Sequence, residues 1–370
     1  MKYRIDTITR CHIGTGTKLI ENVDFISSKG VIGILSPEKI YALLGDLGVD
    51  LWCSAIERKR NLWQDVILTQ KPNTRPEEVC SRVIVRYGES CRELSEQIAS
   101  NGTPYIPGSS LKGAIVSALV GTYREQIKLP YEIRSKNNIV DEQIFVQPEE
   151  KNGRTKYEPT NSLLRLLRVG DAYFKPEHLV AVECYGLNLR ERDPIIDKGA
   201  RMLIECLECE ATATVDIQLL SAFHDTCRRI MPPLPEAMQS EEQLLVAINN
   251  HTKRLLNEEL KFWKSQEGRR YYHIDSEQEQ EEFDEYIGYI EALHDLTDEC
   301  QAGSEALLRV GYGSGWRFMT GGWIDDTHRQ WQQVVAAARP NQYRYDQYDF
   351  PKTRRIGAAP PFGFVQLTKL

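Results

Sequence analysis

Alternating apolar and polar positions predict strands along much of the chain. Tyr3 and Ile5 alternate with charged neighbours in residues 2–8, and residues 23–35 are rich in β-branched side chains. The alternation is most regular in Met202–Leu220, which we expect to be one strand. Further extended or short mixed elements are expected at residues 163–174 and 179–189, from Leu307 onward and at 350–370.

Apolar residues that recur every three or four positions predict helices. Such stripes cover residues 110–125 and 241–265, and another runs through an acidic segment near residues 276–300. Ser36-Pro37-Glu38 marks a further helix start, because serine caps helices and proline suits their first turn. Regular strand–helix–strand alternation is missing, so the pattern predicts an α+β fold rather than a doubly wound sheet.

Two regions have weaker patterns. Residues 50–100 are predicted to be helical and irregular. The polar stretch 128–159 is predicted to be a long exposed insertion with a hairpin around residues 144–146, and such long insertions are often functional or disordered.

Composition places the chain among soluble globular proteins, since 41% of the 370 residues are apolar and 27% are charged. No apolar run reaches membrane-spanning length, and Met1 to Gly14 lacks the apolar core of a signal peptide. The nine cysteines are scattered, which is typical of reduced thiols. We therefore expect a cytoplasmic protein without a membrane association.

The net charge of −7 is unevenly distributed and hides basic regions. Residues 276–300 contain ten acidic and no Lys or Arg residues, so this window carries −10 and the remainder carries +3. Residues 339–370 carry +4. An overall acidic balance thus does not exclude a nucleic-acid partner. The acidic window itself suits a solvated face or a protein contact.

The segment Thr103-Pro-Tyr-Ile-Pro-Gly-Ser-Ser-Leu-Lys-Gly-Ala-Ile115 is a candidate anion site. A loop bounded by Pro and Gly ends in Ser109 and Ser110, and a helix pattern follows. The first N–H groups of a helix lack intrahelical partners and attract anions, and Lys112 adds a positive charge. The alternative is an ordinary capped helix with a solvated lysine.

A second candidate is Gly311-Tyr-Gly-Ser-Gly-Trp316, which follows a predicted strand. Its alternate glycines, Gly311, Gly313 and Gly315, let a backbone approach a ligand and offer successive N–H groups. Tyr312 and Trp316 could stack on bases. The alternative is a tight turn with a core tryptophan. The spacing matches neither a dinucleotide fingerprint nor a phosphate-binding P-loop.

Other candidates stand alone in the sequence. His12, in a turn with Gly14 and Gly16, could be a general base, a phosphate contact or a structural residue. Cys206 and Cys209 have zinc-like spacing without a second pair, so we expect no metal and no cofactor.

The compact segment Phe350-Pro-Lys-Thr-Arg-Arg355 is basic. Its Lys352, Arg354 and Arg355 could clamp phosphates, or could simply be solvated.

Several of these motifs together resemble the RAMP superfamily of CRISPR-associated proteins. The resemblance rests on His12-Ile-Gly-Thr-Gly16, on Tyr105-Ile-Pro-Gly-Ser-Ser-Leu-Lys-Gly113 and on the late glycine loop. Arg309-Val-Gly-Tyr-Gly-Ser-Gly-Trp316 and the basic segment ending at Arg355 are similar to the fifth-subunit family of type III-A (Csm) effector complexes. The order of motifs covers nearly the whole chain, although residues 50–100 and 220–300 match only by position and character.

The resemblance implies a ferredoxin-like, RNA-recognition-type core with large insertions. The core would comprise residues 1–220 and 304–370, with a helical insertion at 221–303. It further implies a non-catalytic subunit that binds guide RNA, caps the backbone filament near the guide 3′ end and supports guide maturation. Its partners would be a neighbouring RAMP backbone subunit and a small helical subunit, with target RNA nearby.

By the same resemblance, guide phosphates would be held by Ser109, Ser110 and Lys112. His12, Gly14 and Gly16 would lie beside them, and the glycine loop with Trp316 would close the path. The repeated middle subunit of such complexes cuts target RNA with an aspartate in an early loop. Asp24 lies here in a strand-like context, so we expect that it does not cleave RNA.

Two alternatives remain open. Some RAMP relatives are metal-independent endoribonucleases that process guide precursors with a histidine base, and His12 with Tyr312 or Lys112 could imitate that arrangement. Against this, those enzymes lack the Tyr105–Gly113 segment. The chain could also be a protein-interaction scaffold whose basic residues are incidental.

Overall fold

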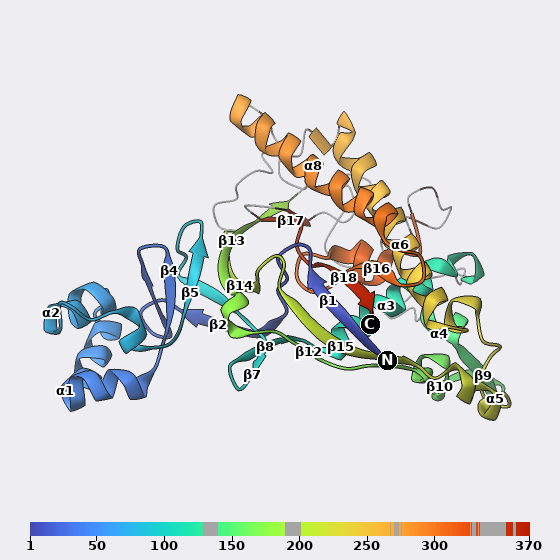
Figure 1. Cartoon of the computed structure of the whole chain (residues 1–370), viewed down its shortest axis with the longest axis horizontal. Coiled ribbons are helices and arrows are strands. Elements are labelled where there is room, and N and C mark those ends of the chain that lie inside the picture. Colours follow the sequence, from blue (N-terminus) through green and yellow to red (C-terminus); the bar gives the residue numbers. More distant parts are fainter. Residues whose placement is uncertain are drawn as a thin grey trace.

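The computed structural model describes most of the chain (Figure 1). The described residues are 1–128, 140–188, 201–266, 268–269, 274, 276–325, 327, 331, 333, 353–357 and 360–370. The architecture is the mixed α+β fold that the pattern predicts. None of the helices in these ranges combines the length and the apolar character needed to cross a bilayer.

The centre of the molecule is a five-stranded antiparallel sheet. Its strands, in spatial order, are β11 (Leu167–Val169), β15 (Thr212–Leu219), β1 (Lys2–Thr7), β18 (Phe364–Lys369) and β16 (Glu305–Arg309). Tyr3 and Ile5 are buried and pair with the buried Val215 and Ala213, as the alternation predicts. The helices α3 (Gly108–Thr122) and α6 (Glu241–Lys264) pack on each other and on this sheet.

A second, eight-stranded sheet continues from the core. Its strands are β2 (Gly14–Ile20), β6 (Glu93–Gln97), β14 (Met202–Leu207), β13 (Leu179–Asn188), β5 (Cys80–Tyr87), β4 (Val31–Leu35) and β3 (Phe25–Ser28), and β17 (Thr353–Gly357) also pairs with β13. Beside β4 and β5, α1 (Pro37–Glu57), η1 (Leu62–Ile67) and α2 (Leu68–Gln70) form a lobe with its own core around Trp63 (Figure 1).

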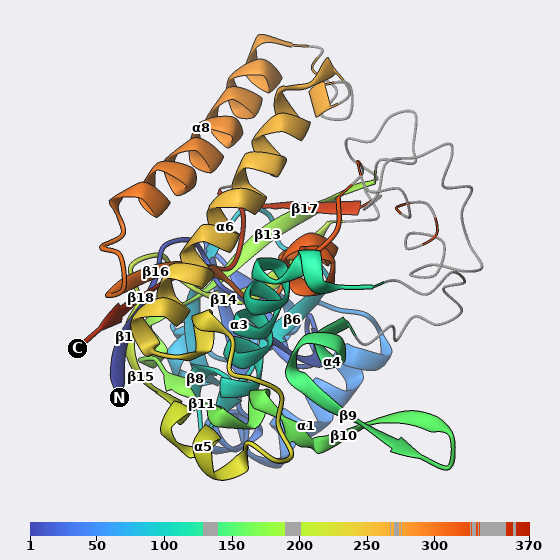
Figure 2. The same cartoon turned by 90° about the vertical axis from the view of Figure 1, so that its right-hand side faces the viewer.

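Smaller elements surround α3. A three-stranded sheet joins β12 (Ala172–Tyr173), β8 (Thr103–Ile106) and β7 (Ala99–Ser100). After α4 (Val140–Phe145), the hairpin of β9 (Val146–Lys151) and β10 (Arg154–Ser162) extends away from the body (Figure 2). The predicted hairpin is therefore present, but it turns at Asn152-Gly153, where both residues have positive φ, and not around residues 144–146.

The remaining described elements are short. They are η2 (Pro76–Glu78), η3 (Arg124–Gln126), η4 (Leu163–Leu166), η5 (Pro176–His178), η7 (Ser221–Phe223), α5 (His224–Cys227), η8 (Glu236–Met238) and the π-helical turn η9 (Arg317–Gly321).

The two long helices predicted from apolar stripes are confirmed as α6 and α8 (Glu277–Glu299), and they pack against each other. Ser240 and Ser276 cap them by accepting backbone N–H groups at their third positions. Trp263 and Phe283 are buried between the two helices, which project together from the core (Figures 1 and 2).

Three strand predictions need correction. Met202–Leu220 forms two strands, and Glu208–Ala211 between them carries the chain from one sheet to the other. Residues 23–35 are the hairpin β3–β4, because Lys29 and Gly30 turn with positive φ. Residues 50–100 contain β5 and β6 as well as helix, since pairing with distant strands outweighs local preference.

Candidate functional site

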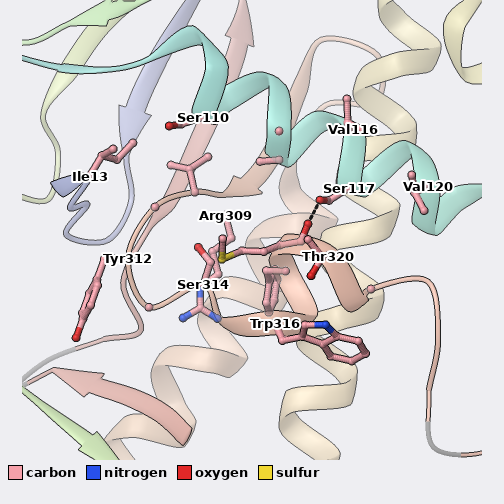
Figure 3. A pocket seen from close by; sticks show the side chains of 18 of the residues that line it. Ile13, Ser110, Val116, Ser117, Val120, Arg309, Tyr312, Ser314, Trp316 and Thr320 are labelled. Atoms are coloured by element: carbon pink, nitrogen blue, oxygen red, sulfur yellow. Dashed lines mark hydrogen bonds between the residues drawn. The ribbon is translucent and has the colours of Figure 1, made fainter. Parts of the chain in front are cut away.

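Three segments that are far apart in sequence line one groove of about 980 Å³. The first is the turn with His12, Gly14 and Gly16, and the second is the exposed side of α3 from Ser110 to Val120. The third runs from Arg309 through the glycine loop into η9. Figure 3 shows the loop with Tyr312, Ser314 and Trp316 passing opposite α3. The fold thus brings together most of the residues that the sequence singled out.

His12 is held rigidly in the wall of the groove. Only 4% of its surface is exposed, and its Nδ1 lies 2.5 Å from the backbone oxygen of Glu205 in β14. The ring also contacts Tyr312 edge to face, with 5.6 Å between ring centroids. Burial lowers the pKa of His12, so the imidazole is neutral at pH 7. It therefore offers no positive charge to a phosphate.

A buried polar network surrounds the side chain of Glu205, whose backbone oxygen contacts His12. The Glu205 carboxylate is fully buried and accepts two hydrogen bonds from the Arg82 guanidinium, at 2.8 and 2.9 Å. It also accepts the backbone N–H of Gln97, whose side-chain oxygen in turn accepts the N–H of Ile13. The sequence did not single out Glu205 or Arg82. A charged residue inside a buried strand was the only signal, and its partner is 123 positions away.

The glycine loop is shaped by close approach to the His12 turn. Gly311, Gly313 and Gly315 all have positive φ. A β-carbon at Gly311 would lie only 2.4 Å from the His12 carbonyl oxygen, which accepts the Tyr312 N–H at 2.8 Å. Glycine is needed at position 311 for both reasons.

The loop's other side chains divide between core and groove. Tyr312 packs its ring against Phe362 and places its hydroxyl near the sulfurs of Cys184 and Met202, so the expected stacking on bases finds no support. Ser314 is 4% exposed, and its hydroxyl has no hydrogen-bond partner among the described residues.

The start of α3 differs from its sequence prediction. Pro107 is the N-cap, so Ser109 and Ser110 lie inside the first turn rather than capping the helix. The Gly108 N–H is used within the fold, since it donates to Asp171 Oδ1 at 2.7 Å. Ser110 lines the groove, and Ser109 is exposed beside it.

Lys112 does not line the groove. Its ammonium donates to the backbone oxygens of Leu164 and Leu167, each at 2.8 Å, and partial burial lowers its pKa. The structure therefore gives Lys112 a role in holding η4 against α3, instead of the free cation that its sequence context suggested.

Trp316 closes one end of the groove beside η9. Gly321 lies directly against the indole, and the guanidinium of Arg317 lies over the rings of Trp316 and Trp331. Ser117 of α3 donates to the Met319 carbonyl and ties η9 to the helix (Figure 3). The tryptophan is half-buried, with part of its surface open to the groove.

The predicted basic clamp is only partly visible. Lys352 lies outside the described residues. Arg354 and Arg355 belong to β17, where their backbones pair with Leu187 and Gly186 of β13.

Asp24 lies in a turn and not in the strand-like context that we expected. Its carboxylate accepts the Ile20 N–H at 2.8 Å, which fixes this turn between β2 and β3. Asp24 is not part of the groove lining. Its lack of cleavage activity stays a prediction.

The described residues contain no group of three or more His, Cys, Asp or Glu side chains arranged to hold a metal ion. Cys206 is buried in β14, and burial raises the pKa of its thiol well above the ordinary value. A neutral, buried thiol is a poor metal ligand.

The groove and the α+β fold around it define a class of protein. A family model described as the RAMP superfamily matches residues 4–318, and the chain belongs to this superfamily. A comparison with curated protein sequences gives no significant match.

Solved structures have a similar fold. The crystal structure of T. onnurineus Csm5 superposes with a TM-score of 0.65 at 19% identity, covering 98% of this chain and 99% of that one. A chain in a cryo-EM structure of a type III-A Csm–crRNA–target RNA ternary complex gives 0.70 at 21% identity, covering 99% and 100%.

Proposed function

We propose that this protein is a guide-RNA-binding subunit of a type III-A CRISPR effector complex, equivalent to Csm5 and without catalytic activity of its own. The observation that carries the proposal is the groove, where the His12 turn, α3 and the glycine loop converge. The superfamily membership and the similarity in fold to Csm5 over the whole chain support it.

The groove can bind a phosphate backbone mainly through the N–H groups of the protein main chain, and less through positively charged side chains. Of its charged lining residues, Arg309 is buried and donates to the Phe362 carbonyl, and Asp141 is acidic. Phosphates would instead meet the hydroxyl of Ser110 and the N–H groups of the glycine loop that do not already donate within the fold, as those of Tyr312 and Ser314 do. Backbone amides in successive turns form such anion-binding concavities.

Blocking the groove tests this proposal. A β-carbon at Gly113 would point into open space along the groove wall, with no atom within 4 Å. Gly113→Trp should therefore fill the groove, keep the helix and abolish binding of single-stranded RNA by the full chain. Gly288→Trp is the matched control, because Gly288 also has open space but lies on α8. If Gly113→Trp binds RNA like the wild type, the strand does not run in this groove.

The position within the complex follows from the same proposal. The subunit would cap the backbone filament near the guide 3′ end, between a neighbouring RAMP subunit and a small helical subunit, and would support guide maturation in the cytoplasm. Target RNA would pass nearby. Co-purification with the sister subunits should recover guide RNA with the wild type, whereas the Gly113→Trp complex should yield less RNA or shorter protection of the guide end.

One observation favours the endoribonuclease alternative. The hydrogen bond to Glu205 leaves Nε2 of His12 as an acceptor, which a general base requires. The expected helpers are engaged elsewhere, since Lys112 donates to carbonyls and Tyr312 packs among sulfurs. Incubation with repeat RNA decides between the two: a single defined cut that is lost in His12→Ala would favour the enzyme.

A further inference from the structure

The environment of His12 fixes which of its ring nitrogens carries the proton. A carbonyl oxygen can only accept a hydrogen bond, so the contact of 2.5 Å with the Glu205 oxygen places the proton on Nδ1. Glu205 belongs to β14, which pairs with β13, so its carbonyl oxygen is fixed in the sheet and holds the ring in this orientation. In the neutral ring, Nε2 is then an acceptor with no proton.

This acceptor lies at the groove. His12 is one of the lining residues, and no hydrogen-bond partner for Nε2 is present among the described residues. Nε2 faces Gly14, where a β-carbon would be only 2.9 Å away. The hydroxyl of Ser314 in the neighbouring loop is likewise without a hydrogen-bond partner among the described residues, although it is buried.

The unprotonated Nε2 of His12 can bind only a ligand group that donates a hydrogen bond. Phosphate oxygens are themselves acceptors, so a neutral Nε2 cannot bond to them. Along a nucleic-acid strand, the regularly available donor near the backbone is the ribose 2′-hydroxyl, which DNA lacks. We propose that Nε2 of His12 accepts a hydrogen bond from a ribose 2′-hydroxyl and so makes this groove selective for RNA over DNA. This inference rests on the proposed function and names the chemical group that His12 reads.

The test compares two ligands that differ in the 2′-hydroxyl alone. Labelled oligouridylate and oligodeoxyuridylate of equal length are titrated with the full chain. One hydrogen bond corresponds to a preference of about threefold to tenfold in dissociation constant. The wild type should bind the ribose form more tightly by this factor. His12→Phe and Gly14→Ala should both abolish the preference, the first by removing Nε2 and the second by covering it with a methyl group.

Two variants keep the test decisive, because His12→Phe also loses the bond to Glu205. Gly14 has no positive φ, so alanine is compatible with its backbone conformation, and its β-carbon, 2.9 Å from Nε2, presses on the ring nitrogen and blocks it. Gly288→Ala is the control, since it adds a methyl group on α8 and should retain the wild-type preference. Thermal melting establishes that each variant is folded.

The possible outcomes distinguish a failure of the 2′-hydroxyl contact from a failure of the proposed RNA-binding function. Equal binding of both ligands by the wild type would overturn the 2′-hydroxyl contact and leave the groove function standing. A preference for the ribose ligand that survives in Gly14→Ala would also overturn it. So would an equal loss of affinity for both ligands in the His12→Phe and Gly14→Ala variants, because that result would indicate that Nε2 accepts from a donor on the base. Failure of the wild type to bind either ligand would overturn the proposed function and this inference with it.

Discussion

Lys112 separates a structural role from a role in RNA binding, because the two predict opposite results. In the structure its ammonium donates to the Leu164 and Leu167 carbonyls, both at 2.8 Å. Replacement by methionine keeps the aliphatic stem and removes both bonds. Hydrogen bonds to charged groups each contribute about 1.5–3 kcal/mol, and partial exposure together with relief of the lysine's desolvation reduces this sum. We expect Lys112→Met to lower the free energy of unfolding by about 2 kcal/mol.

RNA binding should respond differently. Each phosphate neutralised by a cation contributes about −0.7 to the slope of log affinity against log salt for single strands. Since Lys112 faces carbonyls, Lys112→Met should leave that slope unchanged. Urea unfolding and fluorescence-anisotropy titrations over a range of salt concentrations measure the two quantities on the same preparation.

The control is Lys175→Met, because the Lys175 side chain is 74% exposed and pairs with Glu177 at the surface. Its loss should change stability by less than about 1 kcal/mol. If Lys112→Met is as stable as this control and its salt slope falls by about 0.7, the assignment of Lys112 to the fold is wrong and the lysine binds phosphate.

Other substitutions probe the groove and its support. Gly311→Ala should cost about 2 kcal/mol and weaken RNA binding, because a side chain at positive φ would also strike the His12 carbonyl; wild-type stability in thermal melting would contradict this. Glu205→Gln should cost about 3 kcal/mol in urea unfolding, since it breaks a buried ion pair, and a loss below 1 kcal/mol would contradict the network. Burial and the neighbouring Arg254 and Arg124 lower the pKa of His251 to about 3. The contribution of the neutral imidazole to the free energy of unfolding is therefore complete above pH 6.5 and is lost as the pH falls from 6.5 toward 3. His251→Gln should therefore flatten the decline of unfolding free energy, about 1.4 kcal/mol per pH unit, between pH 6.5 and 4.5.

Periodicity and local chemistry were sufficient for the elements whose stability is local. The strand around Tyr3 and Ile5 and the helices α6 and α8 follow directly from apolar spacing. The alternation in Met202–Leu220 correctly predicts extended structure. Alternation alone cannot show that the chain passes from one sheet to the other at Glu208–Ala211. Pairing with strands that are distant in sequence decided that point.

The candidate site was predictable where a backbone requirement shows in the sequence. The alternate glycines of residues 311–315 mark positive φ, and the His12 turn and the α3 segment lie with them in the groove. Lys112 was not predictable, because its carbonyl partners come from a turn more than 50 residues later. The proton position on His12 depends on a carbonyl of β14, which no pattern near His12 indicates.

The three walls of the groove have a consequence for synthesis on the ribosome. They come from residues near 12, 115 and 315, and the sheet beneath them is completed by β18 at residues 364–369. A nascent or prematurely terminated chain that ends before residue 311 lacks one wall entirely. On the proposed function, unfinished polypeptides of this protein would therefore be unable to sequester RNA, and only nearly complete translation products would compete for it.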